Sequence, residues 1–104
     1  MAVHDYRTMT EAVKGLQDRG FPGNFEVIDG LVHDVGSGQT FLAHELTIVE
    51  HHRFEGISDP DDSSVCYALK ARDGTRGILV DAYGTYADPD VSEFLTHVPI
   101  HEKN

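Results

Sequence analysis

The chain has 104 residues, 39% of them hydrophobic and 25% charged, which is typical of one globular domain (residues 1–104) and excludes a disordered segment. Its 18 acidic residues outnumber its 8 lysines and arginines, and the formal net charge of −10 disfavours nucleic acid and anionic lipid as partners. No apolar run approaches the roughly 20 residues that cross a bilayer, and no signal-peptide pattern opens the sequence, so we expect a cytoplasmic protein.

The first predicted element is a helix near residues 9–19. Thr8 and Glu11 stand at capping-box spacing, in which each side chain can satisfy a free amide of the first turn. Gly20 and Pro22 end the helix, because glycine adopts the left-handed C-terminal conformation and proline cannot continue it. Apolar residues recur at three- and four-residue steps along one stripe of this helix, namely Met9, Ala12, Val13 and Leu16.

A small, mainly antiparallel sheet of four strands is predicted to follow. Residues 24–38 read as one or two short strands with a possible tight turn at Asp29-Gly30, and we count them as one N-terminal strand. A three-stranded meander comes next, because turn-forming residues at 58–64 and an Asp-Gly pair at 73–74 separate three β-rich segments. These segments are 46–57, 65–71 and 76–86.

The last predicted element is a helix over residues 90–98. Asp88 can cap it, Pro89 fits its first position, and Pro99 stops it. Each of the two helices has a single apolar stripe, so we expect an α+β fold in which both helices pack on one face of the sheet. The other face would then be open to solvent, to a ligand or to a second copy of the chain, and we expect a homodimer or another protein as the partner.

Three stretches of the chain resemble a known family. They are "MTEAVKGLQDRGF" (9–21), "RFEGISDPDDSSVCYAL" (53–69) and "GILVDAYGTYAD" (77–88). Together they are similar to a family of short bacterial proteins of unknown function, some of which are called phosphoribosylpyrophosphate synthetase. That name implies binding of a phosphorylated ribose through residues 77–88.

Residues 77–88 carry only part of a ribose-phosphate loop. An apolar strand does end at Asp81, and Gly84 and Thr85 follow. However, Ala82 occupies the place of the second acid, the phosphate cradle is short, and no Gly-Lys-Ser/Thr motif supplies an ATP site. A structural interpretation of the stretch, as a strand followed by a bend, therefore has more support than a phosphoribosyl site.

A polar network is the other candidate site of the meander. Arg53, Glu55, Asp81 and Tyr83 are the polar groups expected to meet across its strands, with Thr85 beside them. Such a network either fixes the strand register as an ion pair or lines a small ligand pocket, and structural ion pairs are the commoner case. Cys66 is expected to be a buried structural thiol, because its neighbours are acidic and apolar.

The seven histidines offer a possible metal site. His33, His44 and His51 could converge with an acidic residue, and such a set would hold zinc or magnesium. No cysteine pair and no HExxH spacing supports it, so ordinary surface histidines are favoured and no cofactor is expected.

These patterns favour a non-enzymatic binding or regulatory module. The first alternative is binding or turnover of a phosphorylated ribose or nucleotide through residues 77–88, and the second is metal binding through histidines. A ligand-binding protein would need an electropositive concavity on this acidic surface, whereas a dimer would need an apolar stripe on the open sheet face.

Overall fold

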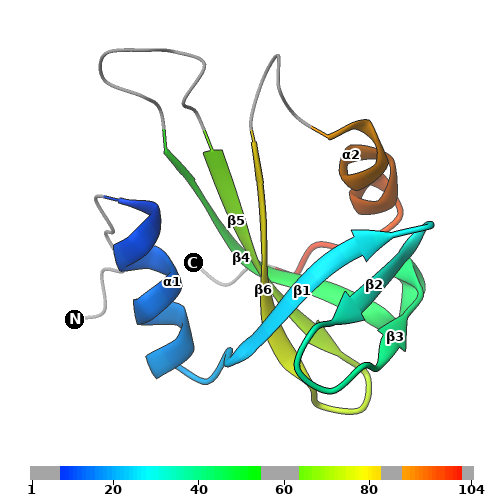
Figure 1. Cartoon of the computed structure of the whole chain (residues 1–104), viewed down its shortest axis with the longest axis horizontal. Helices are drawn as coiled ribbons and strands as arrows, with labels where there is room; N and C mark the ends of the chain where they lie inside the picture. Colours follow the sequence, from blue (N-terminus) through cyan, green and yellow to red (C-terminus); the bar gives the residue numbers. More distant parts are fainter. Residues whose placement is uncertain (1–7, 55–63, 83–87, 102–104) are drawn as a thin grey trace.

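The structure is a computed structural model, and it describes residues 8–54, 64–82 and 88–101. Two α-helices and a 3₁₀ turn are combined with six strands (Figure 1). In chain order the elements are α1 (Met9–Asp18), β1 (Gly23–Ile28), β2 (Leu31–Asp34), β3 (Thr40–Phe41), η1 (Ala43–Glu45), β4 (Leu46–Phe54), β5 (Ser64–Ala71), β6 (Arg76–Ala82) and α2 (Pro89–Thr96).

The six strands form one mixed sheet in the order β3-β2-β1-β6-β5-β4. The predicted four-stranded, mainly antiparallel sheet is therefore wrong. Residues 24–38 supply two strands joined at Asp29-Gly30, and Thr40–Phe41 adds a third. The meander β4-β5-β6 has the predicted antiparallel order, but β1 joins it through a parallel pairing with β6. A parallel partner distant in sequence leaves no local turn signal, so the hairpin patterns could not reveal it.

The sheet is strongly curled. Its two edge strands, β3 and β4, are joined by only four residues, Leu42 to Glu45. Six flat strands would hold the edges about 24 Å apart at the usual strand spacing, whereas the chain from Phe41 to Leu46 reaches at most about 18 Å. The β1-β2-β3 part must therefore fold back across the meander, as Figure 1 shows.

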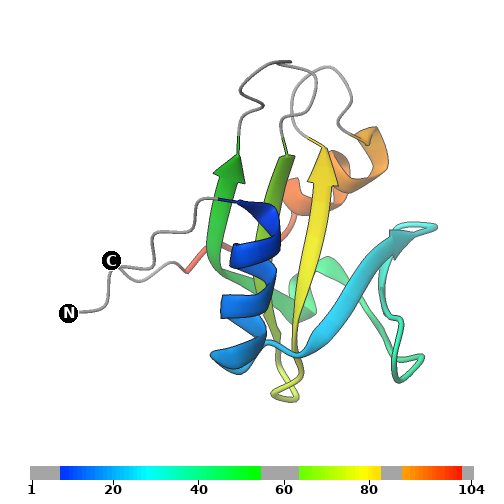
Figure 2. The same cartoon turned by 60° about the vertical axis from the view of Figure 1, so that its left-hand side comes forward.

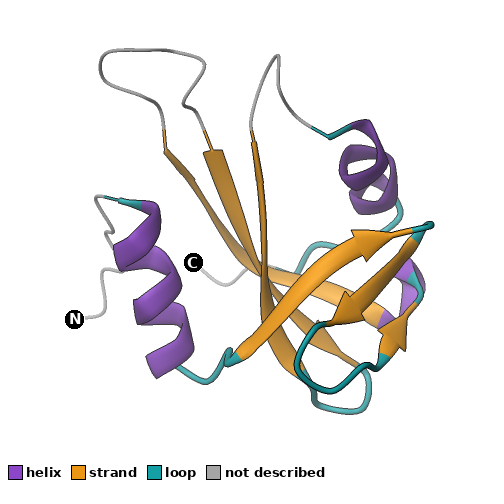
Figure 3. Ribbon diagram, viewed as in Figure 1, coloured by secondary structure: helices purple, strands orange, loops and turns teal. Residues whose placement is uncertain are grey.

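The two helices pack on opposite faces of the sheet, contrary to the prediction that they share one. Figure 2 shows α1 in front of the meander strands and α2 behind them, and Figure 3 shows the same separation from another side. Ala12 and Leu16 of α1 pack with Cys66, whereas Val91 and Phe94 of α2 belong to the core on the other face.

The helices pack on opposite faces because strands β5 and β6 are buried on both of their faces. Adjacent residues such as Ala68 and Leu69, or Ile78 and Leu79, are both buried although their side chains point to opposite faces. Such strands need a cover on each side. The face that we expected to be open is therefore covered over β5 and β6.

After α2, the chain returns to the free edge of β4. Ile100 forms a parallel bridge with Ile48, in which Ile48 N donates to Pro99 O and His101 N donates to Ile48 O, each at 2.9 Å. We call residues 98–101 the C-terminal tail. None of the helices in the described ranges is long and apolar enough to cross a membrane.

Candidate functional site

The predicted polar network is partly visible at the end of the meander. Arg53, Val65 and Asp81 are register partners on three neighbouring strands, so their side chains share one face of the sheet. The Asp81 carboxylate accepts hydrogen bonds from the amides of Ala82 (2.8 Å) and Asp88 (3.3 Å). This carboxylate thus ties the end of β6 to the start of α2, which is a structural role.

The other predicted members of this network, Glu55, Tyr83 and Thr85, lie outside the described residues. Val65, which is buried, stands between Arg53 and Asp81 in the row. The structure therefore places Arg53 and Asp81 on one face, two strands apart.

The three histidines of the predicted metal site lie on three different elements. His33 is in β2, His44 is in η1 and His51 is in β4, where its ring stacks on that of Tyr67 with centroids 6.1 Å apart. Within residues 8–54, 64–82 and 88–101, no three His, Cys, Asp or Glu side chains are grouped so that they could hold a metal ion. The structure does not bring these histidines together.

A charged cluster that we did not predict joins α1 to β4. Arg19 follows the last turn of α1 and donates two hydrogen bonds to the Glu50 carboxylate, at 2.9 and 2.6 Å. His52 Nε2 lies 2.5 Å from the same carboxylate. The Arg19 hydrogen bond is the main reason that the pKa of Glu50 falls to about 2; burial opposes the shift, and His52 adds to it.

Beneath α1, Cys66 is fully buried, as predicted. Burial is the main cause that raises the pKa of its thiol to about 11, because the charged thiolate is poorly solvated there. A nucleophilic cysteine needs an accessible thiolate at neutral pH. Cys66 therefore fills the core between α1 and the sheet.

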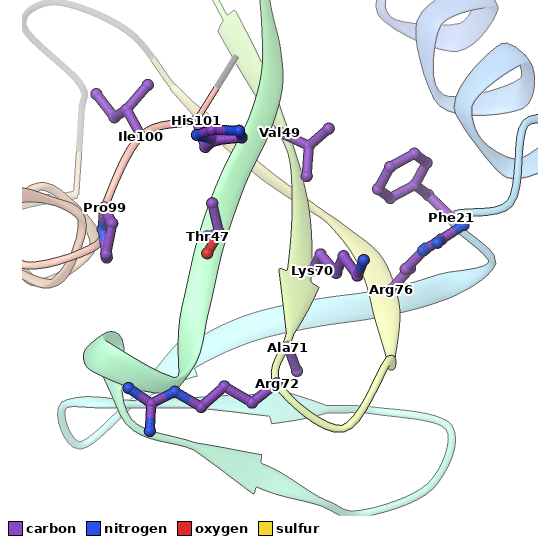
Figure 4. A pocket seen from close by; sticks show the side chains of 10 residues that line it. All are labelled: Phe21, Thr47, Val49, Lys70, Ala71, Arg72, Arg76, Pro99, Ile100 and His101. Atoms are coloured by element: carbon purple, nitrogen blue, oxygen red, sulfur yellow. The ribbon is translucent and has the colours of Figure 1, made fainter. Parts of the chain in front are cut away.

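A cavity of about 770 Å³ lies between the end of α1, the β4-β5-β6 meander and the C-terminal tail (Figure 4). Its floor includes Thr47, Lys70 and Arg76, which are register partners across β4, β5 and β6 and therefore share one face. Apolar walls flank this row: Phe21 lies on one side, and Pro99 and Ile100 of the tail lie on the other.

The cavity is electropositive although the protein is acidic. Lys70, Arg72 and Arg76, three of the 8 lysines and arginines, line it together with His101, and none of its described lining residues is acidic. Lys70, Arg72 and Arg76 form no ion pair with any residue in the described part of the chain. The described lining of the cavity thus gathers positive charge.

The three cations are not equivalent. The Arg76 guanidinium lies 5.9 Å from the centre of the Phe21 ring, in a cation–π contact. In Figure 4, Lys70 and Arg76 extend toward Phe21, whereas Arg72 extends toward the base of β4. Arg76 also lies beside Gly20, just after the C-terminal end of α1, where positive charge complements the helix dipole, so part of its role is structural.

Sequence reasoning missed this cavity for two reasons. The segment "LKARDGTRG" (69–77) does show basic residues on both sides of the Asp73-Gly74 turn, but charges beside a hairpin turn are usually only solvated. The cavity also needs the end of α1 and the C-terminal tail, and no local pattern places those segments beside the hairpin.

Known protein families, curated proteins and solved structures contain no match to this chain. The resemblance to short bacterial proteins stays a prediction from the sequence.

Proposed function

We propose that this protein is a non-enzymatic binding module for a small organic anion, which it holds in the cavity between α1, the meander and the C-terminal tail. The observation that carries the proposal is the group of basic side chains, Lys70, Arg72 and Arg76, in a concavity of a chain whose formal net charge is −10. A protein that binds an anionic ligand needs such an electropositive concavity on an acidic surface.

The size of the cavity supports this function. Small-molecule sites generally occupy about 300–1,000 Å³, and about 770 Å³ lies within that range. The lining supplies hydrogen-bond donors in a partly apolar surround, where an anion and a cation attract each other more strongly than in water. Lys70 can approach an anion as a point charge, and a guanidinium such as that of Arg76 can donate two hydrogen bonds to it.

The residues that line the cavity suit the binding of an anion. The described lining residues combine cations, the hydroxyl of Thr47 and apolar walls. We therefore assign Lys70 and Arg76 to the anionic group of the ligand.

The test is the melting temperature of the protein with citrate, compared with sodium chloride at the same ionic strength. Ligand at ten times its dissociation constant adds about 1.4 kcal/mol to the free energy of unfolding. For a domain of this size the expected rise is roughly 6–11 °C. Citrate is a suitable probe because it carries carboxylates and no apolar tail.

Two variants locate the effect. Lys70→Gln removes a charge from the cavity and should abolish most of the rise. Lys14→Gln removes a charge from the exposed face of α1 and should leave the rise unchanged. Equal shifts in both variants, or no shift in the unaltered protein, would contradict the proposed function.

A further inference from the structure

We infer that the ligand of this cavity is a small phosphate monoester, whose doubly charged phosphate group binds between the side chains of Lys70 and Arg76. This inference rests on the proposed function, and it specifies the chemical class of the anion. It follows from the way in which the fold places these two cations directly opposite each other on neighbouring strands.

Lys70 and Arg76 form a like-charged pair across the β5-β6 hairpin. They are register partners on one face of the sheet, so their Cβ atoms lie about 5 Å apart. In Figure 4 both side chains extend toward Phe21, so their charged ends approach the same part of the cavity. Like charges directly opposite each other destabilise a sheet, and neither side chain has an ion pair within the described residues. A bound anion would remove this repulsion.

The hydrogen-bond donors of Arg76 are available to such an anion. A guanidinium has five N–H donors, and no residue in the described part of the chain accepts a hydrogen bond from that of Arg76. The last carbonyls of α1 do not depend on it, because they accept from the backbone amides of residues 19–21. A guanidinium can donate two parallel hydrogen bonds to a phosphate, and Lys70 adds a compact positive charge beside it.

A phosphate monoester matches the charge of this pair better than a carboxylate does. At neutral pH its phosphate carries a charge of about −1.5 to −2 and has three acceptor oxygens, so one group can compensate both cations. A carboxylate has a single negative charge and would leave one cation of the pair uncompensated. The cavity of about 770 Å³ is much larger than a phosphate group, so we place an organic body on the floor beside Thr47 and Val49.

The acidic character of the whole protein does not prevent this binding. Charges are screened over about 8 Å at physiological ionic strength, whereas the molecule extends over 38 × 35 × 24 Å, so distant carboxylates have little effect at the cavity. Glu50 follows the lining residue Val49, but its carboxylate is paired with Arg19. None of the described lining residues is acidic, so the local charge that a ligand meets is positive.

The closing experiment is a calorimetric titration at pH 8 with methyl phosphate, methyl sulfate and citrate, each at the same ionic strength. Methyl phosphate and methyl sulfate share a tetrahedral shape, but at this pH the phosphate carries two negative charges and the sulfate carries one. We expect the dissociation constant of methyl phosphate to be roughly tenfold lower, because its second charge strengthens the hydrogen bonds from the second cation.

The three anions separate the inference from the proposed function. If methyl phosphate binds no more tightly than methyl sulfate while citrate binds, the inference is overturned and the proposed function stands. If none of the three anions binds, both fail.

Variants at exposed positions locate the phosphate. Lys70→Gln should bring methyl phosphate and methyl sulfate to about the same affinity, because only one cation of the pair then faces either anion. Lys14→Gln, on the exposed face of α1, is the matched control and should keep the preference for methyl phosphate. The readout is a ratio within one variant, so a general loss of stability does not change it.

Arg72→Gln tests the other cation of the cavity, which extends toward the base of β4 (Figure 4). We expect this variant to keep the preference for methyl phosphate. If the preference survives in Lys70→Gln, or disappears in Arg72→Gln, the phosphate does not bind between Lys70 and Arg76 and the inference fails.

Discussion

At the scale of single residues, Glu50 joins α1 to the sheet. Its pKa of about 2 lies below the ordinary value of 4.5, so the folded state holds its proton less tightly than the unfolded chain does. The stabilisation is therefore complete above about pH 4.5, and it is lost as the pH falls toward 2. We expect Glu50→Gln to lower the free energy of unfolding at pH 7 by about 2 kcal/mol, because it removes a charge-assisted pair with Arg19.

Urea unfolding at pH 7 and at pH 2.5 measures this effect. The difference between Glu50→Gln and the unaltered protein should be much smaller at pH 2.5. Glu93→Gln is the control, because its exposed contact with His97 at 3.5 Å contributes little. If the two proteins differ in their free energy of unfolding by the same amount at both pH values, the charge of Glu50 does not cause the loss of stability in Glu50→Gln.

Position 77 must be a glycine, because the ring of Phe25 leaves no room there for a Cβ atom. A Cβ atom at position 77 would lie 2.8–2.9 Å from three atoms of that ring, and Phe25 is only 1% exposed, so the ring has no space to move into. Gly77→Ala should destabilise the fold by about 1–3 kcal/mol through overpacking. Gly36→Ala meets its nearest atom at an ordinary 3.6 Å and should lie within about 0.5 kcal/mol of the unaltered protein in the same urea experiment.

At the scale of elements, α1 begins at a side-chain cap. Thr8 Oγ1 accepts a hydrogen bond from Glu11 N at 3.1 Å, which satisfies one of the free amides of the first turn. Thr8→Ala should lower the free energy of unfolding by about 1 kcal/mol. Thr10→Ala, on the exposed side of the same helix, should be neutral or slightly stabilising. If thermal unfolding shows that both variants lose comparable stability, the Thr8 side chain does not stabilise α1 as a cap.

The elements that the sequence predicts well are those with local signals. Both helices, the caps Thr8 and Asp88, and the turn at Asp73-Gly74 agree with the structure. The Asp29-Gly30 turn also forms, with φ angles of 53° and 78°. Each of these features depends on residues within a few positions of one another, which is why periodicity and turn chemistry suffice to find them.

The arrangement of elements could not be predicted in the same way. The short strand Thr40–Phe41 has no periodic pattern, and the parallel pairing of β1 with β6 depends on the tertiary fold. The β-bulge between Ile48 and Glu50 shifts the alternation in β4, so that Thr47 and Glu50 both face the α1 side. Strand alternation correctly predicted that Arg53 and Asp81 share one face of the sheet. The basic cavity could not be predicted in this way, because it is lined by three segments distant in sequence: Phe21, the meander and the C-terminal tail.

At the scale of the whole molecule, charge controls solubility. The formal net charge is −10 at pH 7 and falls to zero near the isoelectric point of about 4.9. Self-repulsion between copies then weakens, so we expect turbidity to rise between pH 6 and pH 5 in low salt. Light scattering across this window is the measurement, and solutions that stay clear at high protein concentration would contradict it. The same titration in the presence of citrate would show whether a bound anion restores solubility.

The parallel pairing of β1 with β6 also has a consequence for how the chain folds. Each hairpin closes a short loop, but Gly23, Asn24 and Phe25 must find Gly77, Ile78 and Leu79 across more than fifty residues. Closing so long a loop is entropically costly and is favourable only once the partner strand exists. The meander should therefore form first and the β1-β2-β3 unit should dock late, so that mutations in the β5-β6 hairpin slow folding, whereas a mutation at Asn24 mainly speeds unfolding.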